Sequence, residues 1–203
     1  MHCAHGRASG TLAPMDVQLR KWTRVEYERL VEAEILGPDD RVELLGGAMI
    51  FKEPQHSPHA TAVGLVQRAL TEIFGAGWDV RPQMPVALDE ESEPEPDVAV
   101  VPGDPRDYRD AHPTRPVLVV EVALSRLGFD RDRKGSLYAR AGLADYWIVN
   151  LPDRRLEVYR GPVSDGAAPF GWRYGTALAL GPEDRVVPLA APTVTITVAD
   201  LLP

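Results

Sequence analysis

The sequence contains very little cysteine, and this scarcity excludes two kinds of site. Its single cysteine, Cys3, cannot form an internal disulfide or a thiolate metal site. The sequence also contains no apolar run long enough to cross a bilayer, and its first residues lack the apolar segment of a signal peptide. We therefore expect a cytoplasmic protein with no membrane partner.

Lysine is the second scarce residue type. Among the 22 Lys and Arg residues only Lys21, Lys52 and Lys134 are lysines. The formal net charge is −8, so the chain lacks the excess of cations that a tight, constitutive nucleic-acid binder needs to neutralise phosphates. This charge does not exclude a nuclease, because the acids of a nuclease hold metal while its cations gather locally.

Two motifs of other enzyme classes are also missing. The sequence has neither the nucleophile elbow of a serine hydrolase nor a glycine loop that binds nucleotide phosphates. What it does have is 203 residues, 44% hydrophobic and 26% charged, as expected of a soluble globular protein with one core. We expect a disordered tail over residues 1–15 and a single domain over residues 16–203.

Hydrophobic periodicity predicts a mixed sheet with helices packed on it, in the α/β class and bordering on α+β. The two most apolar strands are expected at residues 97–101 and 117–123, where continuous β-branched runs are typical of a sheet covered on both faces. The other expected elements are helices starting near Thr23 and Ser57, a hairpin over 41–51, an irregular strand over 78–88, a helix over 130–141, strands over 144–150, 155–160 and 170–180, and a short helix after Thr197.

Local signals predict where the two N-terminal helices begin and end. Thr23 with Glu26 forms a capping box, and Gly37 followed by proline should stop that helix. Ser57 before Pro58 has the pattern of an N-cap followed by proline in the first turn.

Glu121 is the most informative residue, because it interrupts an apolar strand. Side chains alternate across a strand, so Val117, Val119, Glu121 and Ala123 should share one face. An ionised carboxylate there is costly unless it is paired or holds a metal. Two interpretations remain open: an ion pair with an arginine such as Arg126, or a metal site.

The metal interpretation gains weight from Asp97, which heads the other apolar strand. Two acids from neighbouring strands can bind one hard divalent cation through their oxygens. A bound ion would lower the pKa of a water molecule and polarise a scissile phosphodiester. Lys134 would assist this water or the transition state; the alternative is an exposed lysine in a basic patch. Candidates for phosphate contacts are Arg126, Arg131, Arg133 and Arg140.

A set of motifs in fixed order gives the chain a family resemblance. These motifs are residues 41–47, the helix start at 57–59, residues 95–100, 118–122 with Ser125, Lys134 followed by 138–142, 145–149 and 158–160. Together they resemble the Uma-type family of putative restriction endonucleases, within the PD-(D/E)xK nuclease superfamily. The resemblance extends from about Trp22 to Leu202.

The resemblance implies a restriction-endonuclease-like fold and an endonuclease that cleaves DNA with Mg²⁺ or Mn²⁺. Asp97 and Glu121 match the family's metal ligands. The lysine expected two residues after Glu121 is replaced by Ala123, and the basic role would pass to Lys134 on the following helix.

Three further residues are candidates for the surroundings of the metal. Glu43 matches a family acid and is either a third ligand or a glutamate facing solvent at the hairpin. Gln83 and His59 are expected beside the metal ligands. Because cutting a duplex requires reaching both strands, we also expect a homodimer.

Three alternatives remain open. His56 and His59 are three residues apart and could bind zinc, although a third ligand is missing nearby. The aromatic residues Tyr138, Tyr146 and Trp147 could stack on bases, although core positions are more typical. Finally, the chain could be a catalytically inactive member of the fold that binds DNA or protein.

Overall fold

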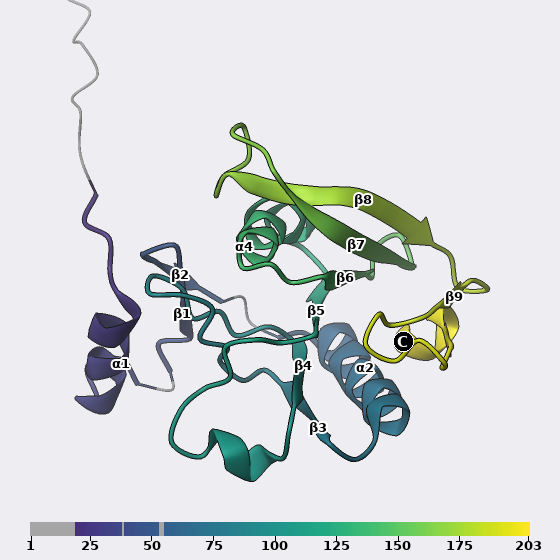
Figure 1. Cartoon of the computed structure of the whole chain (residues 1–203), viewed down its shortest axis with the longest axis horizontal. Helices are drawn as coiled ribbons and strands as arrows, with labels where there is room; N and C mark the ends of the chain where they lie inside the picture. The colour runs from purple at the N-terminus through teal and green to yellow at the C-terminus, as the bar shows by residue number, and fades with distance from the viewer. Residues whose placement is uncertain (1–18, 38, 53–54) are drawn as a thin grey trace, which may run out of the picture.

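The protein is built on a six-stranded mixed sheet (Figure 1). The computed structural model describes residues 19–37, 39–52 and 55–203. The strands, in their spatial order, are β3 (Trp78–Pro82), β4 (Val98–Pro102), β5 (Leu118–Ala123), β6 (Asp145–Asn150), β7 (Arg155–Ser164) and β8 (Trp172–Leu180). Strands β5 and β6 are parallel, and the other neighbours in this sheet are antiparallel. The predicted mixed sheet is therefore confirmed.

Helices and two small hairpins complete the described fold. The longer elements are α1 (Arg24–Glu32), α2 (Ser57–Phe74) and the hairpin of β1 (Val42–Leu45) and β2 (Ala48–Phe51). The β5–β6 crossover contains α3 (Leu127–Phe129), the π-helical turn η2 (Asp130–Lys134) and α4 (Gly135–Arg140). The shorter elements are η1 (Pro105–Tyr108), β9 (Arg185–Val186), β10 (Ile196–Thr197) and η3 (Val198–Leu201). None of the helices in the described residues is long and apolar enough to cross a membrane.

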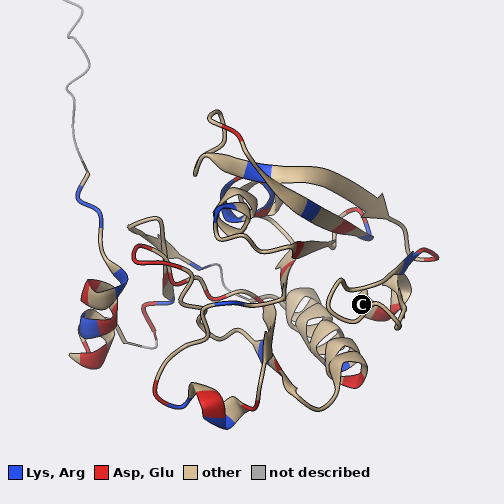
Figure 2. Ribbon diagram, viewed as in Figure 1, with Lys and Arg blue, Asp and Glu red and all other residues tan. Residues whose placement is uncertain are grey.

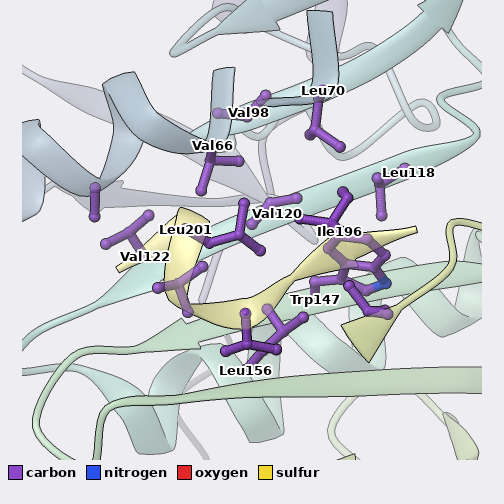
Figure 3. Close-up of a cluster of buried hydrophobic side chains, with 14 of the residues drawn as sticks. Val66, Leu70, Val98, Leu118, Val120, Val122, Trp147, Leu156, Ile196 and Leu201 are labelled. Atoms are coloured by element: carbon purple, nitrogen blue, oxygen red, sulfur yellow. The ribbon is translucent and has the colours of Figure 1, made fainter. Parts of the chain in front are cut away.

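The two faces of the sheet are covered by different elements. On one face, α2 and the C-terminal segment pack on Val120 and Val122 of β5, in a cluster that also contains Trp147 and Leu201 (Figure 3). On the other face, Val119 and Ala123 of β5 pack with residues of α4. This alternation places Glu121 on the α4 face, as the strand pattern predicts. Val117 precedes β5 and packs against the α2 face, so its predicted position beside Glu121 is wrong.

The N-terminal elements confirm most of the local predictions. Thr23 and Glu26 form the complete capping box, but α1 ends at Glu32, before the predicted stop at Gly37. The hairpin turns at Gly46 and Gly47, whose φ angles of 59° and 83° suit a two-residue hairpin turn. The N-cap of α2 is His56 rather than the predicted Ser57.

The crossover after β5 differs from the simple helix expected over residues 130–141. Its helical path begins at Leu127, changes to π geometry over Asp130–Lys134 and returns to α geometry until Arg140. A single π turn inside a helix is often found at functional sites. The aromatic residues of this region, Tyr138, Tyr146 and Trp147, are fully buried, which confirms their assignment to the core. The tail predicted over residues 1–15 lies outside the described residues, and the single domain stays a prediction.

Candidate active site

The described surface contains a cavity of about 120 Å³ beside the end of β5. Its walls are supplied by the β1–β2 hairpin, the start of α2, the segment before β4, and the α3–η2 region. The three predicted catalytic residues, Asp97, Glu121 and Lys134, all line it, and so do Glu43, Gln83 and His59. Six residues scattered over 92 positions of the sequence are thus brought to one place.

Glu121 is held by two donors from the crossover helix. The Lys134 ammonium donates to its Oε1 at 3.0 Å, and the Tyr138 hydroxyl donates to the same oxygen at 2.8 Å. Burial raises the pKa of Glu121 to about 8 against the stabilising charge of Lys134, and the nearby charges of Asp97, Asp130 and Glu43 raise this pKa further. The alternative partner, Arg126, instead donates to the carbonyl oxygen of Phe51 at 2.9 Å.

Lys134 joins two of the acids. Its Nζ lies 3.0 Å from Glu121 Oε1 and 3.2 Å from Glu43 Oε1, and only 9% of its side chain is exposed. Burial lowers the pKa of a lysine, but the charges of Glu121, Glu43, Asp130 and Asp97 raise the pKa of Lys134 well above its ordinary value. The interpretation of Lys134 as an exposed lysine is therefore wrong, and the ammonium stays charged at neutral pH.

Asp97 is oriented by groups from three directions. Its Oδ2 accepts the backbone N–H of Val122 at 2.8 Å and lies 3.1 Å from His59 Nε2, while Gln83 Nε2 donates to Oδ1 at 3.4 Å. Burial raises the pKa of Asp97, but the hydrogen bond and charge of His59, the Val122 amide and Lys134 together hold this pKa below its ordinary value. Gln83 has a φ of 51°, a left-handed conformation that is uncommon for a residue with a side chain and often occurs at functional sites.

Glu43 faces the cavity and not solvent. It is only 3% exposed, and its Oε2 accepts the backbone N–H of Glu95 at 3.0 Å. The alternative of a solvent-facing glutamate is wrong. Three of the carboxylates that line the cavity therefore come from three separate segments, namely β1, the residue before β4 and the middle of β5.

The chemistry of these donors fits a hard divalent cation. Carboxylate oxygens are the preferred protein ligands of Mg²⁺, and a protein site usually supplies one or two of them. Within residues 19–37, 39–52 and 55–203, no three His, Cys, Asp or Glu side chains are already arranged around one ion. Lys134 pairs with Glu43 and Glu121, and His59 lies 3.1 Å from Asp97. A carboxylate has about four lone-pair sites, so these contacts leave acceptor positions for an ion.

The zinc alternative at His56 and His59 lacks a third ligand in the part of the chain that is described. His59 contacts Asp97 instead, where it lies beside a predicted metal ligand.

The four predicted phosphate-contact arginines do not lie together. Arg126 lines the cavity. Arg131 forms a double hydrogen bond with Glu157, and Arg140 pairs with Asp89 at 2.7 Å. The guanidinium of Arg133 lies over the ring of Phe170, 5.4 Å from its centroid. The structure thus brings only Arg126 of this set to the cavity wall.

One residue that contacts the predicted acids was not predicted as part of the site. Tyr138 is fully buried in the core, yet its hydroxyl donates to Glu121. The signal was present in the sequence, because residues four apart lie on the same face of a helix and Tyr138 follows Lys134 by four.

Comparisons with known proteins agree with this fold. The family model Uma2, described as putative restriction endonuclease, matches residues 24–199. No curated protein matches the chain. The solved structure of a putative nuclease belonging to DUF820, from Anabaena variabilis ATCC 29413, is similar to it with a TM-score of 0.68 and 15% sequence identity. That likeness covers 89% of this chain and 97% of the other, and it confirms a nuclease-type fold.

Proposed function

The chain belongs to the Uma2 family of putative restriction endonucleases, and on that premise we propose that it is a metal-dependent endonuclease that hydrolyses phosphodiester bonds of DNA. One structural observation supports this proposal in addition to the family match. Asp97, Glu121 and Glu43 line one cavity from three separate segments, and the ammonium of Lys134 lies 3.0 and 3.2 Å from two of them. An acidic pocket with one buried lysine has the composition expected for hydrolysis of an anionic ester.

We assign the binding of Mg²⁺ or Mn²⁺ to Asp97 and Glu121, with Glu43 as a third ligand. An ion bound there would lower the pKa of a water molecule and polarise the phosphorus–oxygen bond. The Val122 amide and His59 orient Asp97, and Tyr138 orients Glu121. Lys134, charged at neutral pH, stabilises the negative charge that develops on the phosphate or positions the attacking water.

Cleavage of plasmid and of single-stranded DNA, with Mg²⁺ or Mn²⁺, tests the proposal. We expect nicking or cutting by the wild-type protein. We expect Asp97→Asn and Glu121→Gln to lose at least 100-fold in rate, because each removes a charged oxygen ligand. Lys134→Gln should lose a comparable factor, in the range of one preorganised charge.

Glu72→Gln is the matched control, because Glu72 is exposed on α2. This variant should keep the wild-type rate. Equal rates in all five proteins would show that any cleavage comes from a contaminant or from another site.

A catalytically inactive binding module is the second candidate, and Ala123 is the observation that favours it. This residue stands where the superfamily motif has lysine, and it is buried in the core cluster of the α4 face. Thermal unfolding with and without Mn²⁺ separates the candidates in part. A metal-dependent enzyme is stabilised by the ion in an Asp97-dependent way, whereas a module that has lost its metal site is not.

We further propose that the protein acts as a homodimer, because a duplex-cutting nuclease must reach both strands. Sedimentation velocity of the wild-type protein should then give the mass of two chains, near twice 22.3 kDa. A single-chain mass at the concentrations used for cleavage would contradict this part.

A further inference from the structure

Two cations lie next to each other at the open end of the β1–β2 hairpin. The backbone N–H of Lys52 donates to the carbonyl oxygen of Arg41 at 2.7 Å, so these residues face each other across the hairpin. Both line the same cavity as the acids.

A third cation is fixed to the same end of the hairpin. Arg126, at the N-cap of α3, donates from its guanidinium to the carbonyl oxygen of Phe51 at 2.9 Å. Phe51 is the residue directly before Lys52, and Arg126 also lines the cavity. Arg41, Lys52 and Arg126 therefore gather on one side of the cavity, which we call the basic rim.

Two contacts through Glu95 connect the basic rim to the acids of the cavity. The ammonium of Lys52 pairs with the Glu95 carboxylate, and the backbone N–H of Glu95 donates to Glu43 Oε2 at 3.0 Å. One residue thus separates the rim from a predicted metal ligand. A phosphate held at the rim would be a near neighbour of one held at the acids.

Other arginines of the crossover are engaged elsewhere in the protein. Arg131 and Arg140 pair with Glu157 and Asp89 outside the cavity. Figure 2 shows that Lys and Arg segments alternate with Asp and Glu segments along the ribbon, in keeping with the net charge of −8. The cavity has an acidic wall and a basic rim together.

We propose that Arg41, Lys52 and Arg126 form a second phosphate site, which binds the backbone phosphate next to the scissile one. This inference rests on the proposed function. Three cations that line one cavity suit a phosphate group, whose oxygens accept hydrogen bonds from Lys and Arg. The rim therefore contacts backbone, and backbone contacts position a nucleic acid without reading its sequence.

The salt dependence of DNA affinity tests whether the basic rim binds a phosphate of the DNA backbone. The probe is a fluorescein-labelled DNA oligonucleotide, single- or double-stranded, with Ca²⁺ in place of Mg²⁺ and anisotropy as the readout. Each phosphate that the protein neutralises contributes about one unit to the slope of log affinity against log salt. Because the three cations share one phosphate, we expect Arg41→Gln, Lys52→Gln and Arg126→Gln each to lower the slope by part of about one unit and to weaken binding uniformly for unrelated sequences.

The matched control is Arg106→Gln. Arg106 lies on η1, its side chain is 90% exposed, and it is not part of the cavity wall. This variant should keep the slope and affinity of the wild type. A circular-dichroism melt of each variant separates loss of a contact from loss of fold.

The possible outcomes distinguish failure of the phosphate-site proposal from failure of the nuclease proposal. If the wild type cuts DNA but the three rim variants bind with its slope, the phosphate site is wrong and the nuclease stands. If the rim variants lower the slope while the wild type cuts no DNA, the site stands and the nuclease is wrong. Equal losses in Arg106→Gln and the rim variants, or no DNA binding by the wild type, would overturn the site.

Discussion

Lys134 is the buried cation that pairs with Glu121. A carboxylate inside an apolar strand is costly to bury without such a partner. The π turn of η2 and the packing of α4 bring Lys134 Nζ to 3.0 Å from Glu121, whereas Arg126 donates to the carbonyl oxygen of Phe51.

Lys134 pairs with two of the carboxylates that we assign to the metal, Glu43 and Glu121. We therefore predict that Lys134→Gln binds Mn²⁺ at least several-fold more tightly than the wild type while losing cleavage. Removing a positive charge from beside Glu43 and Glu121 increases their attraction for a cation. Isothermal titration calorimetry gives the affinity. Weaker Mn²⁺ binding by this variant would mean that the ammonium helps to assemble the ligands instead of competing.

Tyr138 contributes to stability through one buried hydrogen bond. Tyr138→Phe keeps the ring in the core but removes the donor to Glu121 Oε1, now 2.8 Å away. We expect the free energy of unfolding to fall by about 1–3 kcal/mol, a range that spans hydrogen bonds to neutral and to charged groups. Urea unfolding measures this. Leu137→Ala, in the same helix and fully buried, should cost more, about 2–5 kcal/mol, because it opens a cavity.

At the scale of elements, local signals predicted some helix boundaries and missed others. The capping box of Thr23 lies within four residues of sequence, so α1 begins where it should. The end of α1 at Glu32 depends on what this helix packs against, and so does the π turn that ends at Lys134. A local sequence pattern does not contain this information. The glycine pair at residues 46–47 predicted its hairpin for the same local reason.

The carboxyl group of Glu93, which lies beside α1, should make the stability of the protein depend on pH. The Arg24 backbone N–H donates to the Glu90 carbonyl, and Glu28 of α1 interacts with the buried Glu93. Burial, together with the charge of Glu28 and a hydrogen bond to it, raises the pKa of Glu93 to about 7, from 4.5 when exposed. The folded protein therefore binds this proton more tightly than the unfolded chain does, and stability falls as the pH rises from about 4.5 through 7.

Glu93→Gln should remove this dependence, because its amide stays neutral. Relative to the wild type, the variant should gain on the order of 2–3 kcal/mol in free energy of unfolding between pH 4.5 and pH 8, the equivalent of the pKa difference. Urea unfolding of both proteins at the two pH values measures the gain. A stability difference that does not change with pH would show that Glu93 ionises normally in the folded protein.

At the scale of the whole molecule, the fold brings together acids that are far apart in the sequence. The two apolar strands could be predicted from composition, and the family motifs predicted that Asp97 and Glu121 belong to one site. The antiparallel β4–β5 pairing accounts for their proximity, since it places Val98 opposite Val120. The place of Glu43 could not be predicted this way, because it depends on how the β1–β2 hairpin lies against the segment of Glu95.

A Mn²⁺ titration of the wild type, Asp97→Asn and Glu121→Gln by calorimetry tests the central claim most directly. It asks whether carboxylates from separate strands form one metal site, and it does not depend on choosing the right DNA sequence. We predict one ion per chain for the wild type and at least tenfold weaker binding for each variant, as expected when a charged ligand is lost. Equal affinities for the three proteins, or no binding by the wild type at millimolar Mn²⁺, would contradict the account.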